Sequence, residues 1–189
     1  MTHFTTTQKL YMSLVKRPIG FLGALVALIL LSPVFLATIV LLFFANKGAG
    51  VFFTQDRPGK NEKIFKALKF KTMTDERDAE GNLLPDADRL TPVGKFVRST
   101  SIDELPQLIN ILKGDMSFIG PRPPLTYHPW PIEEYTEEQK RMFDIRPGIT
   151  GWWAANGRSA TTYEKRLELE YYYCRNCSLF LDIKCILLT

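Results

Sequence analysis

The chain has 189 residues and a mass of 21.6 kDa, which fits one compact domain with an appended element. Hydrophobic residues make up 46% of it and charged residues 23%, a composition that excludes a disordered or low-complexity protein. The net charge is +4, yet residues 1–71 contain ten Lys and Arg against two acids, so positive charge is concentrated around an apolar N-terminal run. This distribution is typical of a protein on an anionic membrane surface and argues against nucleic-acid binding.

The apolar run is the first expected element. No charged side chain occurs between Arg17 and Lys47, and residues 18–45 would measure about 40 Å as a straight helix, enough for a bilayer core. Pro33 removes a backbone hydrogen bond in the middle of the run, and the Ser32 hydroxyl can satisfy the freed group, so a bend is expected there. Basic residues flank the run on both sides, which favours a helix–break–helix that enters the membrane and returns. A single spanning helix with a proline kink remains the alternative.

A β-hairpin is expected next. Residues 51–55 and 64–73 have the composition of strands, and Pro58-Gly59 between them suits a type II turn. Residues 75–89 are polar and are expected to form a surface loop.

Short helices are expected in the remainder of the chain. Thr91 and Pro92 predict the N-cap and first turn of a helix that continues through Arg98. A second helix is expected over 101–114, because Leu105, Leu108, Ile109 and Leu112 would line one face of it. Pro106 is tolerated only near a helix start, which places that start at about residues 101–103. Further helices are expected over 136–143, 162–175 and 178–188, whereas 117–131 and 146–151 are expected to be irregular. Short helices around a small hairpin define an α+β protein.

Two adjacent carboxylates, Asp103 and Glu104, are the main candidates for chemistry. They lie in the expected first turn of the helix over 101–114, where free N–H groups and the helix dipole stabilise negative charge. An ionised Asp can attack phosphorus, while a neighbouring carboxylate can hold Mg²⁺. Ser101 and Glu104 also fit a purely structural capping box, and from these residues alone that interpretation prevails.

Basic residues on irregular backbone favour the chemical interpretation. Arg122, Arg146 and Arg158 each lie beside Gly or Pro. A guanidinium group matches the geometry of phosphate, and glycine lets backbone N–H groups approach it. Each arginine alone fits an ordinary surface loop, but together with Lys69 and Arg98 they point to a diphosphate substrate.

Two other groups of residues are weaker candidates. Cys174, Cys177 and Cys185 are an odd number with no nearby His, which predicts buried or interfacial thiols rather than a disulfide framework or a zinc site. Trp152 and Trp153 fit base stacking and membrane-interface anchoring equally well.

Several motifs occur in order along the chain. They are FTQDRPG at 53–59, KFKTM at 69–73, DELPQ at 103–107, KGDMSFIGPRP at 113–123, RPGITG at 146–151 and NGR at 156–158. From about residue 16 to its end, the chain resembles the bacterial monotopic phosphoglycosyl transferases, also called bacterial sugar transferases. The resemblance implies a re-entrant membrane helix broken at Ser32-Pro33 within a segment 1–46, and a catalytic domain 47–189 on the cytoplasmic face of the bacterial inner membrane.

The resemblance also implies the reaction. Such enzymes transfer a sugar-1-phosphate from a UDP-sugar to polyprenyl phosphate and release UMP, the first membrane step of glycoconjugate assembly. Here Asp103 would be the nucleophile that forms a covalent phosphosugar intermediate, and Glu104 would assist with Mg²⁺. Arg122 matches an arginine that meets phosphate, and Lys69 and Arg98 match basic active-site residues. Ala154 stands where relatives often carry Gln, which puts any substrate contact of that Gln in doubt.

Two other functions fit parts of the sequence. A non-catalytic module that docks anionic lipid or a partner protein explains the basic flanks, but it gives Asp103 and Glu104 no role. A glycosidase is disfavoured because carboxylates on adjacent residues are poorly placed to flank a sugar ring. The sequence does not identify the sugar or the glycan pathway, and it leaves open a homodimer or contacts with other enzymes of the pathway.

Overall fold

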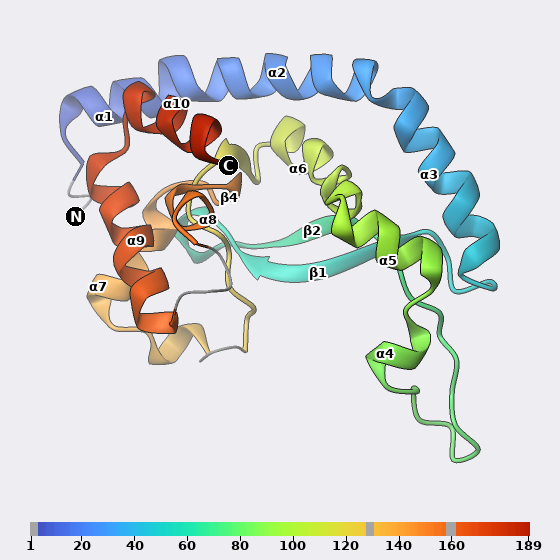
Figure 1. The fold of residues 1–189 in the computed structure, drawn as a ribbon. Coiled ribbons are helices and arrows are strands. Elements are labelled where there is room, and N and C mark those ends of the chain that lie inside the picture. The colour runs from blue at the N-terminus through green and yellow to red at the C-terminus, as the bar shows by residue number, and fades with distance from the viewer. Residues whose placement is uncertain (1–3, 128–130, 158–161) are drawn as a thin grey trace.

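The computed structural model describes residues 4–127, 131–157 and 162–189 of the chain. Helices surround two small two-stranded sheets, which confirms the expected α+β class. Figure 1 shows α1 and α2 running along one side of the molecule, with α3 turning away from the end of α2. The hairpin β1–β2 lies beneath α2, and the C-terminal helix α10 lies beside the N-terminal helices.

The N-terminal helices contain the expected break. Helices α1 (Thr6–Leu10) and α2 (Arg17–Leu30) are joined by a π-helical turn, and α3 (Ser32–Ala45) begins after Leu31. Pro33 has no N–H to donate to the carbonyl of Ile29, four residues earlier, and the Ser32 hydroxyl donates to that oxygen at 2.8 Å. The break at Ser32-Pro33 and the compensating role of Ser32 are therefore confirmed.

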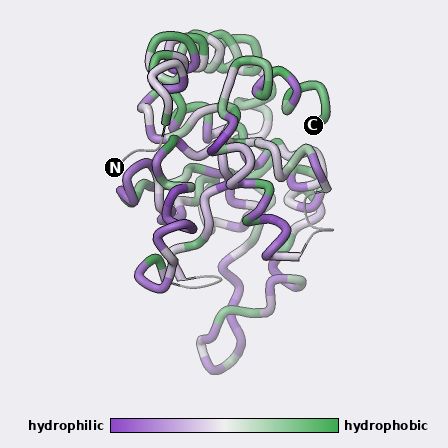
Figure 2. The backbone as a smooth tube through the Cα atoms, turned by 90° about the vertical axis from the view of Figure 1, so that its left-hand side faces the viewer, coloured by the Kyte–Doolittle hydropathy of each residue, from purple (hydrophilic) through white to green (hydrophobic). Residues whose placement is uncertain are grey.

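Large apolar side chains are exposed on the outer faces of α2, α3 and α10 (Leu179–Leu188). Exposed fractions reach 71% at Leu30, 74% at Phe44 and 79% at Leu187. Figure 2 shows these hydrophobic segments at one end of the molecule and hydrophilic residues toward the other. The helix Thr6–Leu30 is long and apolar enough to cross a membrane. A continuous apolar surface of this kind is typical of contact with lipid.

The expected hairpin is present, with its turn displaced. Strands β1 (Phe52–Pro58) and β2 (Ile64–Phe70) pair antiparallel, and Pro58 still pairs with Ile64. The turn therefore occupies residues 59–63 rather than 56–60, and the N–H of Gly59 donates to the carbonyl of Lys63 at 2.9 Å.

The free edge of β2 is covered by one side chain of α6 (Gln107–Lys113). Asn110 is 1% exposed; its Nδ2 donates to the carbonyl of Lys66 at 2.8 Å, and its Oδ1 accepts from the N–H of Leu68 at 2.9 Å. The amide thus replaces a third strand. This pairing fixes α6 against the strand that carries Lys69.

A second sheet lies where irregular structure was expected. Strands β3 (Ser117–Ile119) and β4 (Gly148–Thr150) pair parallel, so the expectation for 117–131 and 146–151 was partly wrong. Three-residue strands are too short to leave an alternating pattern in the sequence. Glycine allows the close approach, since a Cβ on Gly120 would lie 2.5 Å from the carbonyl oxygen of Arg146.

The remaining helices follow their capping residues. Thr91 and Thr136 each cap a helix through their side-chain oxygens, as expected, and Thr162 and Ser178 do the same for two further helices. The capped helices are α5 (Pro92–Ser99), α7 (Glu137–Lys140), α9 (Tyr163–Asn176) and α10. Two more short helices are α4 (Asp86–Arg89) and α8 (Trp152–Ala155), and 3₁₀ turns occur at Lys60–Glu62, Ile132–Glu134 and Arg141–Asp144.

A buried polar cluster ties the N-terminal helices to α10. Asp182 accepts hydrogen bonds from the hydroxyls of Tyr11 at 2.6 Å and Tyr173 at 2.5 Å, and it pairs with Lys16 at 2.8 Å. The expectation of buried free thiols is confirmed, because all three cysteines are buried and none forms a disulfide bond: Cys174, Cys177 and Cys185.

Candidate active site

Asp103 and Glu104 lie in a 3₁₀ turn, Ile102–Glu104, between α5 and α6. Leu105 continues the 3₁₀ pattern by donating to the carbonyl of Ile102 at 3.0 Å, and Pro106 has no N–H, so α6 begins only at Gln107. The continuous helix expected over 101–114 is therefore wrong at its start.

The capping box is also wrong. Ser101 has φ +57°, in the left-handed region, and its side chain makes no capping hydrogen bond. A serine in this conformation is uncommon, because its Cβ is crowded there. The turn thus places both carboxylates beside the basic residues rather than at the start of a helix.

Two of the basic residues named from the sequence contact these carboxylates. The Lys69 Nζ lies 2.7 Å from Glu104 Oε1 and 3.6 Å from Asp103 Oδ2. The Arg122 Nη2 lies 2.7 Å from the same Glu104 Oε1. Strand β2 supplies Lys69, and the segment after β3 supplies Arg122, so three distant parts of the chain meet here.

The two carboxylates have opposite electrostatic character. Burial would raise the pKa of Glu104, but the charge and hydrogen bond of Arg122, followed by those of Lys69, outweigh it and hold the pKa at about 2. Burial raises the pKa of Asp103 above its ordinary value; Lys69 opposes this rise and the charge of Glu104 adds to it. The expectation that a helix terminus stabilises the charge of Asp103 is therefore replaced by a partly desolvated, more basic carboxylate.

Arg98 lies on α5 at the same site. Its Nε donates to the Thr72 hydroxyl at 2.7 Å, and its charge acts to lower the pKa of Asp103. Helix α5 approaches residue 72 closely, because a Cβ on Gly94 would lie 2.0 Å from the carbonyl oxygen of Thr72. Glycine at this position therefore lets Arg98 reach the site.

A cavity of about 660 Å³ opens beside the carboxylates. Its polar wall contains Arg98, Asp103, Glu104 and Arg122, and its apolar wall includes Ala27 of α2 and Leu31 at the break between α2 and α3. The other lining residues are Ser101, Leu105, Leu108, Phe118, Ile149, Thr150, Trp153, Ala154 and Thr189. The break in the N-terminal helices thus forms part of the site.

Trp153 and Ala154, both noted in the sequence, lie on α8 in this wall. The Arg166 guanidinium lies 4.7 Å from the centre of the Trp153 ring.

Glu170, whose carboxylate accepts a hydrogen bond from the N–H of Arg122 at 2.9 Å, was not identified from the sequence. It lies on the buried stripe of α9 between Leu167 and Tyr173, and a carboxylate at such spacing is a signal that could have identified it.

Arg146 is not brought to the carboxylates. The Arg146 Nε donates to the carbonyl of Gly114 at 2.7 Å, and its side chain lies with Lys16, Arg17 and Lys60 in a separate small cavity. Burial lowers the pKa of Arg146, and the charge of Arg17 adds to this effect. Arg158 lies outside the described residues.

Asp103 and Glu104 offer oxygen ligands of the kind that Mg²⁺ requires. Within residues 4–127, 131–157 and 162–189, no three His, Cys, Asp or Glu side chains gather into a metal site of their own. However, the ion pairs use only Oδ2 of Asp103 and Oε1 of Glu104. The other oxygen of each group fits Mg²⁺ that takes its remaining ligands from phosphates and water.

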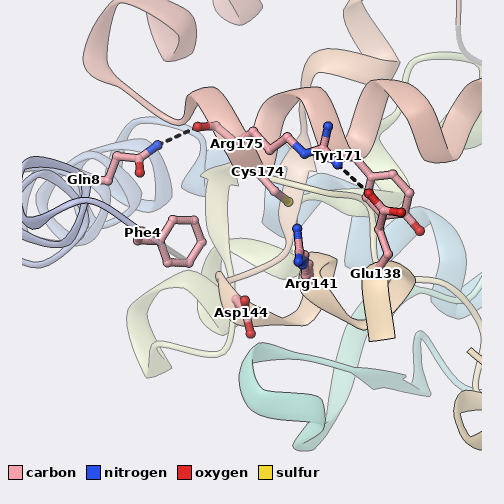
Figure 3. A pocket seen from close by; sticks show the side chains of 8 residues that line it. All are labelled: Phe4, Gln8, Glu138, Arg141, Asp144, Tyr171, Cys174 and Arg175. Atoms are coloured by element: carbon pink, nitrogen blue, oxygen red, sulfur yellow. Dashed lines mark hydrogen bonds and ion pairs between the residues drawn. The ribbon is translucent and has the colours of Figure 1, made fainter. Parts of the chain in front are cut away.

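Another cavity, of about 100 Å³, lies between α9 and the N-terminus (Figure 3). Figure 3 shows Arg175 reaching across to Glu138, and Gln8 donating to the carbonyl of Arg175 at 2.7 Å. Neither carboxylate of the 3₁₀ turn lines it. The larger cavity is therefore the candidate active site.

Comparisons with known proteins find relatives named as sugar or sugar-phosphate transferases. The chain is 48% identical to the uncharacterized sugar transferase EpsL of Bacillus subtilis, over 93% of this chain and 85% of that protein. It is 39% identical to the UDP-glucose:undecaprenyl-phosphate glucose-1-phosphate transferase of Escherichia coli, over 93% of this chain.

It is also 39% identical to the UDP-N-acetylgalactosamine-undecaprenyl-phosphate N-acetylgalactosaminephosphotransferase of Aeromonas hydrophila, over 89% of this chain. The match spans only 39% of the Escherichia coli protein and 41% of the Aeromonas protein. The model of the family described as bacterial sugar transferase matches residues 11–189. The chain belongs to the bacterial sugar transferase family.

Proposed function

We propose that this protein transfers a sugar-1-phosphate from a UDP-sugar to undecaprenyl phosphate and releases UMP. The observation that carries the proposal is the cavity that Asp103, Glu104, Arg98 and Arg122 line against the apolar break of the N-terminal helices. Lys69 contacts both carboxylates. Relatives that share over a third of its residues are named for this reaction with different sugars. The site thus combines groups that bind a diphosphate with a wall that suits a lipid.

The reaction would proceed in two displacements at one phosphorus. A carboxylate oxygen of Asp103 attacks the phosphorus that carries the sugar, and the bond from that phosphorus to the bridging oxygen breaks, so UMP leaves with the electron pair. A phosphate oxygen of undecaprenyl phosphate then attacks the same phosphorus. The bond to Asp103 breaks, which regenerates the carboxylate and yields the lipid diphosphosugar. This scheme predicts ping-pong kinetics.

The surrounding residues have separable roles in this scheme. The desolvated, more basic carboxylate of Asp103 suits a nucleophile, whereas Glu104 stays ionised and holds Lys69 and Arg122 in position. Arg122 and Arg98 would bind phosphate oxygens. Mg²⁺ held by Asp103 and Glu104 would neutralise charge on the diphosphate. Addition of EDTA should therefore abolish UMP release, and addition of Mg²⁺ should restore it.

The same proposal includes a re-entrant course for the N-terminal helices, with the site at the cytoplasmic face of the bacterial inner membrane. Both ends of the apolar run bind the same folded body. Before the run, Arg17 donates to the carbonyls of Ile111 and Leu112. After the run, Asn46 donates to the carbonyl of Lys71 at 2.7 Å. A membrane-spanning helix would place these two ends on opposite sides of the bilayer.

The central experiment follows UMP release and the covalent intermediate. Detergent-solubilised protein is incubated with Mg²⁺, undecaprenyl phosphate and a panel of UDP-sugars, and the wild-type protein should release UMP with at least one donor. With donor alone, rapid quench and intact-protein mass spectrometry should detect a phosphosugar adduct. Asp103→Asn should lack both the adduct and turnover. Asp88→Asn, an exposed substitution on α4, serves as the matched control.

Two results would contradict the proposal. A protein that releases no UMP with any donor would instead fit a lipid-docking or partner-docking module. Full turnover by Asp103→Asn would remove Asp103 from the role of nucleophile. Topology is tested separately: cysteines introduced at Thr7 and Glu80 should both react with a membrane-impermeant reagent only from the cytoplasmic side. Labelling of Thr7→Cys from the opposite side would exclude the re-entrant course.

A further inference from the structure

The segment around Arg122 has little backbone structure of its own. Pro121, Pro123 and Pro124 flank Arg122, so Arg122 carries the only amide hydrogen between Gly120 and Leu125. Residues 120–125 belong to no helix or strand. The N–H of Gly148 donates to the carbonyl of Pro121 at 3.0 Å, but with one amide hydrogen of its own between Gly120 and Leu125 the segment forms few backbone hydrogen bonds. Some other contact must fix the arginine that meets Glu104.

Two charged side chains of α9 supply such contacts. The N–H of Arg122 donates to Glu170 Oε1 at 2.9 Å, and the carbonyl of Arg122 accepts from Arg166 Nη2 at 3.0 Å. Glu170 is 1% exposed. Both backbone groups of Arg122 are thus bound by one face of α9, where residues 166 and 170 are one turn apart.

A third charged side chain holds the next residue. Arg57, at the end of β1, donates from Nη1 to the carbonyl of Pro123 at 2.8 Å. Burial, followed by the charges of Arg122 and Arg166, lowers the pKa of Arg57 to about 10. Three guanidinium groups therefore lie close together around this segment, and the buried carboxylate of Glu170 lies 3.9 Å from the Arg166 Nε.

Glu170 is not used in the proposed reaction, and burying its charged carboxylate costs free energy. Burial raises its pKa to about 7, although the hydrogen bond from the Arg122 N–H and the charges of Arg166 and Arg122 oppose the rise. In the described part of the chain no donor is bonded to its Oε2. A carboxyl group kept in such a place needs a compensating role.

We propose that Glu170, Arg166 and Arg57 form a clamp that fixes the backbone of Arg122, so that the Arg122 guanidinium stays on Glu104 and on the diphosphate of the donor. Glu170 is then a positioning residue that acts through Arg122. The kinetic part of this inference rests on the proposed function, whereas the clamp itself is testable without turnover.

Hydrogen exchange of the full-length protein tests the clamp directly, because Arg122 supplies the only amide between Gly120 and Leu125. In Glu170→Ala, this amide should exchange at least about tenfold faster than in the wild type. In Glu170→Gln, exchange should stay within about threefold, since the amide oxygen can accept the same bond. Glu168→Gln, on the same helix with a side chain 66% exposed, is the matched control and should leave exchange unchanged.

Unchanged protection of the Arg122 amide in Glu170→Ala would overturn the clamp. If Glu170→Ala instead exchanges faster throughout the chain, the fold has been lost and Glu170→Asp decides. This variant keeps the charge but shortens the side chain by one carbon. Faster exchange confined to Arg122 would then support the clamp, and wild-type protection at Arg122 would contradict it.

A double-mutant cycle tests whether Glu170 acts through Arg122. Glu170→Ala should lower kcat/KM for UMP release at least about tenfold in the wild-type background, but less than about twofold in an Arg122→Ala background. Glu170→Gln should recover most of the activity. An equal loss in both backgrounds would overturn the positioning role. If the wild type releases no UMP, the proposed function fails, and hydrogen exchange still decides the clamp.

Discussion

Asn110 offers the sharpest test of how the fold builds the site. It is 1% exposed and binds both the Lys66 carbonyl and the Leu68 N–H on the free edge of β2. Asn110→Ala would leave two backbone groups unpaired away from water. Each such loss costs about 1–3 kcal/mol, so we expect destabilisation of about 2–6 kcal/mol. Because α6 would no longer be fixed to the strand carrying Lys69, kcat/KM should also fall.

Thermal unfolding in detergent at a fixed scan rate measures this effect. For a chain of this size, about 2–4 °C of Tm corresponds to 1 kcal/mol, so the apparent Tm should fall by about 4–24 °C. The matched control is Asn176→Ala, which removes an exposed asparagine bonded to the Tyr172 carbonyl on its own helix. An Asn110→Ala protein with the Tm of the control would refute the view that this amide serves as the missing strand.

Three further predictions concern the site and its supports. Lys69→Met should raise the pKa of Asp103 further, because the positive charge of Lys69 lowers it. As the proposed nucleophile, Asp103 must be ionised, so the acid limb of the pH–rate profile should move to higher pH. Gly94→Ala should cost about 1–3 kcal/mol by overpacking against Thr72, and it should lower activity because Arg98 is displaced, as thermal unfolding and UMP release will show. Pro33→Ala should restore a backbone hydrogen bond and straighten the helix break, so cysteine labelling of the N-terminus should change sides or UMP release should fall.

Elements with strong local signals were predictable from the sequence. The break at Ser32-Pro33 and the caps at Thr91 and Thr136 depend on groups one to four residues apart, and the structure confirms them. The strands β3 and β4 were not predictable, because each has three residues and its partner lies about thirty residues away.

The site was predictable in its members but not in its geometry. Lys69 and Arg122 were named from their neighbours, and both contact Glu104. Arg146 looked equivalent to Arg122 beside Pro, yet its side chain binds the Gly114 carbonyl instead. Glu170 was overlooked because its partner is a backbone amide 48 residues earlier in the chain. The spacing of Glu170 on α9 could have marked it as buried, but its partner could not be predicted, because a pairing over 48 residues leaves no pattern in a local window.

The break between α2 and α3 has a consequence for how the enzyme matures. Ala27 and Leu31 belong both to the apolar N-terminal helices and to the wall of the catalytic cavity. Arg17 at the head of these helices also binds the carbonyls at the end of α6. A newly made chain whose N-terminal helices have not yet packed against the rest of the protein therefore lacks one wall of the candidate active-site cavity. A fragment that begins after residue 46 would lack both this wall and the hydrogen bonds from Arg17 to the end of α6.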